Sequence, residues 1–540
     1  MGNVAGVERG ALSGVCGLQT SKVGRTESGV EPLKVQSELT AGGEPQDLVE
    51  LSPVAQSLLG PVGQIVGAIG QQLERIMASP HELGADSIPI LDPTVAEIAR
   101  QLVAKGEVEP QELSILQAPI FGGKDQNILV GSDGRGGLEV RIGSHRFHYD
   151  PEEAKGLIIA CGPQGGKVET HPDVKLPLHL AGGKGNDHLE GGQGDDIIAG
   201  GAGRDYLYGD RGHDLLLGGA GSDLLYGGPG VDLLRGGAGH DYLQGGLGPD
   251  HLQGGAGQDI LFGGQGDDHL EGGSGADLLV GGLGRDMLIG GSGPDRLVGG
   301  TTEANSDRLL DLAEEDRYEA IEPQASVPGI KITPQAYVEP FPFLDGFYST
   351  YGLSQAYARR FEEQVTDDLE SLASLPSGQQ LFKALEEHGH PVEIIKTDLE
   401  NGLCISLQGS QAFSDEQGQP GLGSPALVAY NPSYAQIYDH LPWSEAPPAL
   451  ILAHELSHAY NSTRGDMDPR QAIESGSDAQ GQFSYPVPAP EFQAVGIPLE
   501  GLTPNPPFAT ENGWRRELNL PPRLAYGPVA DPQHSWDSRS

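Results

Sequence analysis

The stretch "GGAGSDLLYGGPGVDLLRGGAGHDYLQ", residues 218–244, repeats with a period of nine residues. Each repeat has an aspartate at its sixth position and a leucine two residues later. The register holds from Ala181 to Gly300, where Leu or Ile follows every aspartate at the same spacing. The thirteen aspartates in register are Asp187, Asp196, Asp205, Asp214, Asp223, Asp232, Asp241, Asp250, Asp259, Asp268, Asp277, Asp286 and Asp295. A flexible glycine-rich linker would not keep Asp and Leu in step, so the segment is predicted to form a regular structure.

The residue types of the repeat indicate which structure it forms. Glycines allow tight turns with positive φ, and a short strand around each leucine can point one apolar side chain into the core of a parallel β-roll. Aspartate carboxylates and turn carbonyls from neighbouring turns supply the oxygen ligands that Ca²⁺ prefers. The pattern G-G-x-G-x-D-x-U-x resembles the RTX family of calcium-binding repeats, which implies several structural Ca²⁺ ions bound at the aspartates. Without calcium we expect the segment to be largely disordered, because like charges repel and glycine entropy opposes order.

A second pattern, "ALILAHELSHAYNSTRG" at residues 449–465, indicates a metal-dependent active site. His454 and His458 are four residues apart, so on a helix both imidazoles face the same side and could bind one Zn²⁺. Glu455 is placed to take a proton from a zinc-bound water, as a general base. Pro447 and Pro448 suit the start of a helix, and the residues that follow are apolar. The alternative is an ordinary helix that carries two histidines and a glutamate by chance.

Two histidines leave a catalytic zinc one protein ligand short. The metzincin extension would need Gly at 461 and His at 464, but the chain has Asn461 and Arg464. A carboxylate from a later helix is the remaining choice. Glu491 opens the helix-prone run "PEFQAVG" and is followed three residues on by a small alanine, which would allow close packing against the zinc helix. We predict Glu491 as the third ligand, with Glu511 as the alternative; otherwise Glu511 is a partner behind the ligands or a helix cap.

Two downstream blocks, "APEFQAVGIP" (489–498) and "TENGWRRELNLPPRLAY" (510–526), resemble the NleD-like bacterial effector zinc metallopeptidases when taken together with HELSHAYN. The resemblance covers roughly residues 336–527 and points to Glu491 as well. It implies an effector that is injected into host cells, where known members cleave mitogen-activated protein kinases in the activation loop. Arg523 and Tyr526, spaced R-x-x-Y, resemble the pair by which clostridial neurotoxin peptidases steady the substrate and the oxyanion. Their alternative roles are a structural ion pair and a packed aromatic ring.

Composition restricts the partners of the chain. Its 540 residues carry a formal net charge of −43, which argues against nucleic acid and anionic membranes and suits calcium. The cysteines Cys16, Cys161 and Cys404 are too far apart for a disulfide framework. No apolar run reaches the length of a transmembrane helix, and the first 30 residues lack the apolar core of a classical signal peptide. We therefore expect a protein that is secreted or delivered into a host cell, with calcium and a host protein substrate as its partners.

The chain is expected to be multidomain, with a parallel β-roll in the middle and an α+β, zincin-like metallopeptidase domain at the C-terminus. A small helical and β-rich region should precede the roll, including an amphipathic helix over 53–78. The expected segments are a disordered N-terminus at 1–48, a helical region at 49–115, a β-rich cap at 116–180, the roll at 181–300, a cap and linker at 301–335, the peptidase domain at 336–527 and a tail at 528–540.

Two functions are compatible with these features. The first is a secreted or injected zinc-dependent endopeptidase, an effector or toxin, that hydrolyses a host protein; the resemblance suggests a protein kinase. The second is a calcium-binding structural or adhesive RTX protein whose peptidase domain is inactive. The complete HELSH motif and its downstream blocks favour the first function.

Overall fold

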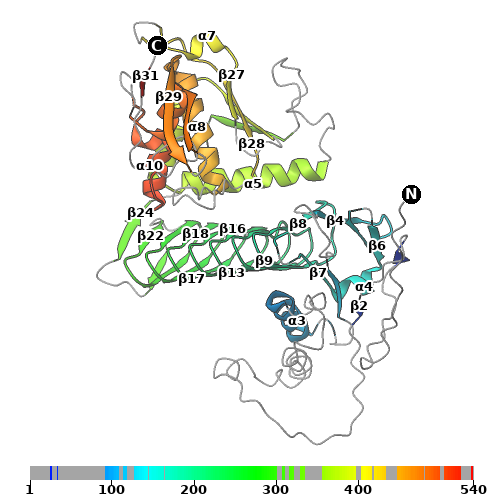
Figure 1. Cartoon of the computed structure of the whole chain (residues 1–540). Helices are drawn as coiled ribbons and strands as arrows, with labels where there is room; N and C mark the ends of the chain where they lie inside the picture. Colours follow the sequence, from blue (N-terminus) through cyan, green and yellow to red (C-terminus); the bar gives the residue numbers. More distant parts are fainter. Residues whose placement is uncertain are drawn as a thin grey trace, which may run out of the picture.

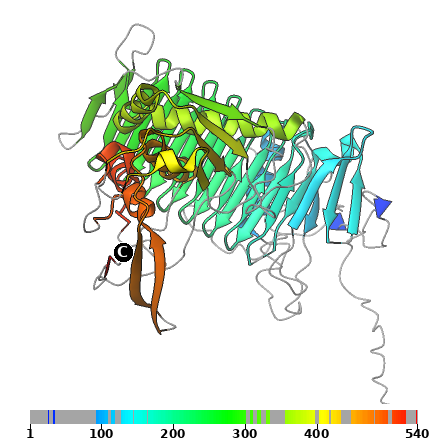
Figure 2. The same ribbon diagram turned by 90° about the horizontal axis from the view of Figure 1, so that it is seen from above.

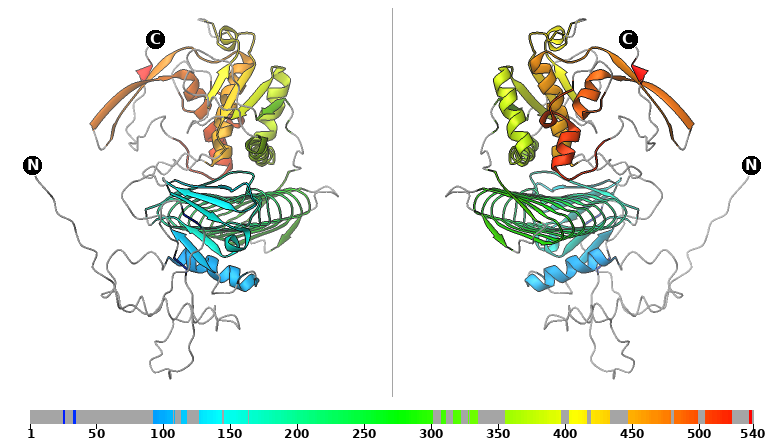
Figure 3. Two further views of the ribbon diagram at one scale, coloured as in Figure 1. Left: turned by 90° about the vertical axis from the view of Figure 1, so that its right-hand side faces the viewer. Right: turned by 90° about the vertical axis from the view of Figure 1, so that its left-hand side faces the viewer.

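The computed structural model describes two large regions, the roll and the domain docked on it (Figure 1). The described residues are 25–26, 33–34, 92–106, 108, 113–117, 127–143, 145–162, 164–300, 307–310, 316–321, 327, 329–334, 355–396, 403–415, 419–432, 447–478, 481–498, 504–523 and 537–538. The helix predicted over 53–78 and the side chain of Tyr526 lie outside them. Seen along the roll in Figure 3, the C-terminal domain covers one face and helix α3 (Pro93–Lys105) covers the opposite one.

The repeats form the predicted parallel β-roll, which consists of two facing sheets. Sheet A contains β8 (Lys167–Thr170), β10 (His188–Glu190), β12 (Tyr206–Tyr208), β14 (Leu224–Pro229), β16 (Tyr242–Leu247), β18 (Ile260–Gln265), β20 (Leu278–Leu283), β22 (Arg296–Gly299) and β24 (Arg317–Ala320). Sheet B contains β7 (Leu157–Ala160), β9 (His179–Lys184), β11 (Ile197–Ala202), β13 (Leu215–Ala220), β15 (Leu233–Ala238), β17 (His251–Ala256), β19 (His269–Ser274), β21 (Met287–Ser292) and β23 (Arg308–Leu310). Viewed from above in Figure 2, the strands are stacked as regular rungs.

One turn of the roll takes two repeats, so neighbouring strands of a sheet are related by a shift of 18 residues. In sheet A, for example, Leu225 pairs with Leu243 and Leu243 with Leu261. These leucines are fully buried between the sheets, as are their counterparts in sheet B, such as Leu234 and Leu252. The leucine that recurs every nine residues therefore fills the interior from both sides. Glycine is required at the turns: a Cβ on Gly221, where φ is +139°, would lie 1.5 Å from the carbonyl oxygen of the preceding turn.

The roll extends past the thirteen repeats at both ends. At its start, sheet A continues through the antiparallel strands β4 (Asn127–Ser132), β5 (Leu138–Ile142) and β6 (His145–Tyr149), then the two-residue β1 (Arg25–Thr26); sheet B continues through β3 (Ser114–Gln117) and β2 (Leu33–Lys34), and α4 (Pro151–Lys155) links β6 to β7. At its end, Asp307 and Asp316 continue the aspartate ladder, since their carboxylates accept hydrogen bonds from the backbones of Asp286 and Asp295. This continuation lies within the segment expected to be a cap and linker.

The aspartates form a buried ladder along the roll. The Asp205 backbone N–H donates to Oδ1 of Asp223 at 2.9 Å, and the same bond recurs every turn. The second oxygen, Oδ2, of Asp205 and of Asp223 is buried without a hydrogen-bond partner among the described residues. A Cβ on Gly218 would lie 2.7 Å from that Oδ2 of Asp223 and 2.6 Å from the carbonyl oxygen of Gly236. Oxygens from two turns thus converge on a space that only glycine leaves open, which fits Ca²⁺.

The C-terminal domain is a mixed α/β unit. Its four-stranded sheet has the order β25 (Ile330–Thr333), β26 (Val392–Lys396), β28 (Ala426–Tyr430) and β27 (Leu403–Ser406), with β27 antiparallel at the edge. Its helices are α5 (Gln355–Ala373), α6 (Pro376–His388), α7 (Gly409–Ala412), α8 (Pro448–Arg464), α9 (Ala489–Val495), η3 (Pro507–Ala509) and α10 (Glu511–Glu517). The hairpin of β29 (Gln471–Asp478) and β30 (Gly481–Pro488), joined by β31 (Asp537–Ser538), projects outward just before α9 (Figure 2).

Calcium ions and protons compete for the buried aspartate carboxylates of the ladder. Burial raises the pKa of Asp205 to about 7 and, together with the charge of Asp232, that of Asp250 to about 9. In the metal-free chain, stability is therefore present below the ordinary aspartate pKa of about 4 and lost as the pH rises through the folded values. Without calcium, we expect circular dichroism to show strand content that increases as the pH is lowered from about 9 towards 5. With calcium, the half-saturating concentration should increase over the same change. Strand content that is independent of pH without calcium would contradict this prediction.

A neighbouring pair of aspartates provides the control. Asp268 belongs to the ladder and is buried, whereas Asp267 is exposed and pairs with Arg285. Asp268→Asn should weaken calcium-dependent folding, and Asp267→Asn should leave its midpoint unchanged.

Candidate metal centre

The candidate centre is built on helix α8. The helix begins directly after Pro447 and ends at Gly465, whose φ of +76° is left-handed. Nearly every residue between them is buried, which agrees with the apolar run ahead of His454. The helix packs against the strands β27 and β28 and against the helices α5, α6, α9 and α10. The sequence thus places the helix that carries the candidate metal ligands in the interior of the domain.

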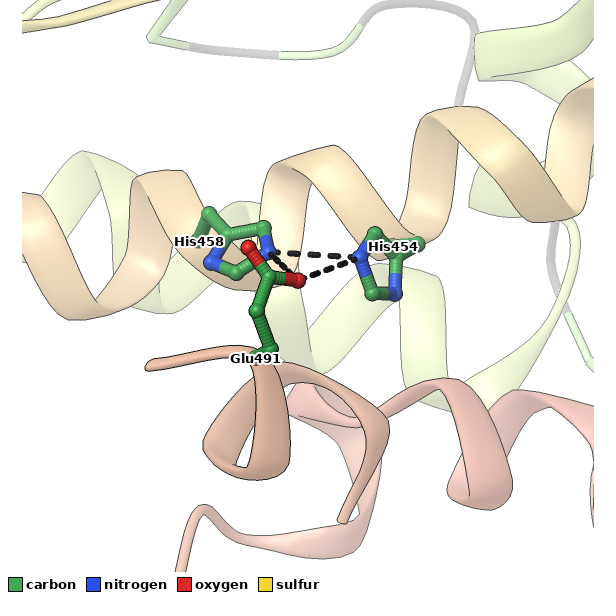
Figure 4. Close-up of side chains that lie close together, drawn as sticks. All are labelled: His454, His458 and Glu491. Atoms are coloured by element: carbon green, nitrogen blue, oxygen red, sulfur yellow. Dashed lines mark hydrogen bonds and ion pairs between the residues drawn. The ribbon is translucent and has the colours of Figure 1, made fainter. Parts of the chain in front are cut away.

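The three residues expected to be metal ligands lie together (Figure 4). Nε2 of His458 is 3.2 Å from Nε2 of His454 and 3.1 Å from Oε2 of Glu491. That same carboxylate oxygen lies 3.6 Å from Nε2 of His454. The histidines project from successive turns of α8, and the glutamate projects from the first turn of α9. Two imidazole nitrogens and one carboxylate oxygen that converge in this way match the ligand set of a catalytic zinc site.

Glu511, the alternative ligand, lies on the other side of His454. Its Oε2 is 3.0 Å from Nδ1 of His454, the ring nitrogen that faces away from Glu491. The Glu511 carboxylate also accepts hydrogen bonds from Nε of Arg515 at 2.7 Å and from Nη1 of Arg523 at 2.9 Å. A carboxylate in this position favours the tautomer with a proton on Nδ1, which leaves Nε2 free to bind metal. The ion pair with Glu511 thus holds Arg523 close to the centre. A structural ion pair is the alternative role considered for this arginine.

Charges in the centre are strongly coupled. Burial opposes a charge on His454, but hydrogen bonds with Glu491 and Glu511 outweigh it and raise the pKa of His454 to about 10. Burial also opposes ionisation of Glu511, yet the charges of Arg523 and Arg515 hold the pKa of Glu511 well below its usual range. The charge of His458 lowers the pKa of Glu491 against its burial. Without metal, His454 thus holds a proton between two ionised carboxylates.

Glu455 points to the edge strand. Its carboxylate accepts a hydrogen bond from the backbone N–H of Cys404 on β27, and the residue is only 6% exposed. Burial raises the pKa of Glu455, although both histidines of the centre oppose the shift. A buried carboxylate with a raised pKa beside a metal centre is suited to accept a proton.

Sequence reasoning missed Arg515, which holds Glu511 in place behind His454. The two are spaced i, i+4 on α10, and this spacing in "ENGWR" is the signal that could have identified the pair. The role of Cys404 depends on the pairing of β27 with β28, which the sequence motif does not contain.

Comparisons with known proteins agree with both parts of the chain. Residues 350–526 match the Peptidase_M91 family, which is described as an effector protein. Five segments between residues 179 and 301 match the RTX calcium-binding nonapeptide repeat. Among curated proteins, no match was found. Calcium-binding repeats followed by an effector peptidase domain are thus confirmed, in the predicted order. Within the described residues, no helix has the length and hydropathy needed to cross a membrane.

The positions of the two glutamates predict different effects on zinc binding. Glu491→Ala removes one of the three converging atoms and should abolish tight zinc binding. Glu511→Ala removes only the partner of His454, so zinc should remain after dialysis, with affinity lowered by about 10- to 100-fold. Metal analysis and a competition titration measure both effects. Full zinc occupancy in the Glu491 variant would assign the third ligand elsewhere.

The protonated state of His454 predicts that zinc binding releases a proton. The stabilising contribution of this proton is present below the ordinary histidine pKa of about 6.5 and lost as the pH rises through about 10. Because zinc needs the neutral ring, its dissociation constant should rise as the pH falls from about 9 to 6. Calorimetry in two buffers of different ionisation enthalpy counts the released protons. Glu511→Gln should lower that number at neutral pH, and an unchanged number would contradict the assignment.

Proposed function

We propose that this protein is a zinc-dependent endopeptidase that cleaves a host protein. The observation that carries the proposal is the convergence of His454, His458 and Glu491 beside Glu455, inside a domain that matches an effector peptidase family. The alternative of an adhesive or structural calcium-binding protein accounts for the repeats, but it gives no reason for two imidazoles and a carboxylate to share one partly buried centre.

His454, His458 and Glu491 would hold the zinc ion, which would polarise the scissile carbonyl and lower the pKa of the attacking water. Glu455 accepts the proton of that water and passes it to the leaving amine. Glu511 keeps His454 in the correct tautomer, and Arg515 and Arg523 keep Glu511 ionised. For Tyr526 we propose a contact with the substrate oxyanion, with Arg523 held beside the centre.

The substrate class follows from the family description. An effector peptidase acts on proteins of a host, and the NleD-like blocks suggest a protein kinase with an accessible activation loop. The calcium-binding repeats are typical of secreted proteins, so we propose that the chain is exported before it acts.

The general base provides the test of this function. Glu455→Gln keeps the shape and hydrogen-bonding capacity of the side chain but removes its basicity, so turnover should fall by at least about 100-fold while zinc remains bound. Terminal-peptide profiling of host lysate incubated with each protein should reveal new protein ends only with the wild type. If zinc is bound at one equivalent but the two profiles are identical, the peptidase assignment fails and the structural alternative gains support.

A further inference from the structure

The two outer faces of the roll differ in character. In every repeat, the side chains on either side of the central leucine point away from the interior. On sheet A these outward positions carry mostly apolar residues, all of them buried. They are Tyr206, Tyr208, Leu224, Tyr226, Tyr242, Ile260, Phe262, Leu278, Val280 and Val298. On sheet B, by contrast, the same positions include Arg235, His251, Gln253 and Glu271, which are exposed or half-buried.

The C-terminal domain covers the apolar face of sheet A. Helix α5 lies along the roll in Figure 1, and its Phe361, Val365 and Leu369 are buried in the same cluster as the roll tyrosines. That cluster continues without interruption into α8, through Leu452, and into α10, through Trp514. The outer face of sheet A and the interior of the peptidase domain therefore form one hydrophobic core.

A buried arginine fastens α5 to the roll. Nη1 of Arg360 donates to Oε2 of Glu190 at 3.0 Å and to the carbonyl oxygen of Thr170 at 3.1 Å, and Nη2 donates to the carbonyl oxygen of Gly191 at 3.3 Å. Asp210 completes the set as an ion-pair partner. Arg360 is only 9% exposed, so its charge is satisfied almost entirely by groups of the roll. If the roll unfolded, this arginine would lose all of these partners together.

A second contact reaches the candidate metal centre. Nη1 of Arg296 on β22 donates to the carbonyl oxygen of Glu517 at 2.5 Å. Glu517 is the last residue of α10, and Glu511, which contacts His454, is the first. A strand of the roll therefore holds one end of the short helix whose other end orients a metal-binding histidine.

We infer that sheet A of the calcium-folded roll is a structural part of the peptidase domain, so that calcium binding in the roll determines whether the candidate metal centre is assembled. The roll supplies one wall of the core, the acceptors for Arg360 and the anchor for α10. Coupling of this kind is reciprocal, so the docked domain also raises the calcium affinity of the roll. The inference concerns assembly of the domain and holds whether or not the proposed reaction occurs.

The chain contains a suitable reporter for this coupling. It has three tryptophans, none of them in the repeats, and Trp514 is fully buried on α10. In a full-length Trp443→Phe/Trp536→Phe background, all tryptophan emission comes from Trp514. Calcium is added to the calcium-free protein in a buffer that contains one equivalent of zinc, and strand content is followed by circular dichroism. We expect Trp514 emission to shift to the blue at the same calcium midpoint as the strand signal. Native Trp514 emission while the roll is still unfolded would overturn the inference.

Two arginine variants separate the interface from the roll itself. Arg360→Gln changes no aspartate of the ladder, and Arg285→Gln removes an exposed pair on the roll surface as the matched control. Arg360→Gln should move the Trp514 midpoint to at least about threefold higher calcium and lower zinc retention on dialysis, whereas the control should match the parent. A Trp514 midpoint unchanged in Arg360→Gln would overturn the inference. If Arg360→Gln does not fold at all, the milder Gln265→Ala, which removes the contact with Glu370, is read by the same criteria.

Discussion

Each turn of the roll buries carboxylates that the protein itself only half satisfies. One oxygen of Asp223 accepts a backbone hydrogen bond, and the other is buried without a donor among the described residues. A buried, uncompensated charge costs several kcal/mol, more than the roughly 1.5–3 kcal/mol that one buried leucine contributes. Because each repeat offers only one interior leucine, hydrophobic burial does not offset a row of ionised aspartates. The fold of the roll, and of whatever packs on it, therefore depends on cations or protons that neutralise the ladder.

The calcium-binding ladder and the candidate metal centre differ in the chemistry of the ligands that they offer. The ladder offers only oxygen atoms, which suits Ca²⁺, whereas His454, His458 and Glu491 offer two nitrogens and one oxygen, which suits Zn²⁺. The groups that position these ligands differ as well. Backbone groups position the ladder aspartates, so the same arrangement recurs in each turn. Glu511 and two arginines position His454, and this arrangement of side chains occurs at a single place among the described residues. This separation would allow calcium to control folding without competing for the proposed zinc position.

The sequence predicted those features that depend on local spacing. The aspartate and leucine register predicted the roll, and HELSH with the later "PEFQAVG" predicted the three residues that converge. The end of the roll was not predicted, because three extra residues precede Asp307 although Asp316 again follows nine residues later. The apolar outer face of sheet A was not predicted either. The repeats of sheet A carry aromatic residues such as Tyr226 and Phe262 at the outward positions, whereas the alternating repeats of sheet B carry polar ones such as His251. Which ring nitrogen of His454 faces Glu511 depends on helix packing, and no spacing encodes it.

The joint core also bears on where the peptidase could act. Extracellular calcium-binding modules bind calcium with dissociation constants of about 10⁻⁴–10⁻³ M, whereas cytosolic sensors need about 10⁻⁷–10⁻⁵ M. A roll with affinities of the first kind would be unfolded in the producing cell. The docked domain would be unassembled there as well, which would protect the producer from the proposed proteolysis. The same roll would lose calcium in a host cytosol, where a kinase substrate of the proposed kind would lie. A cytosolic kinase substrate therefore requires a roll that binds calcium much more tightly. The reciprocal coupling through Arg360 and the outer face of sheet A is one source of that added affinity. Without that added affinity, the calcium requirement would fit a host protein substrate in a calcium-rich compartment.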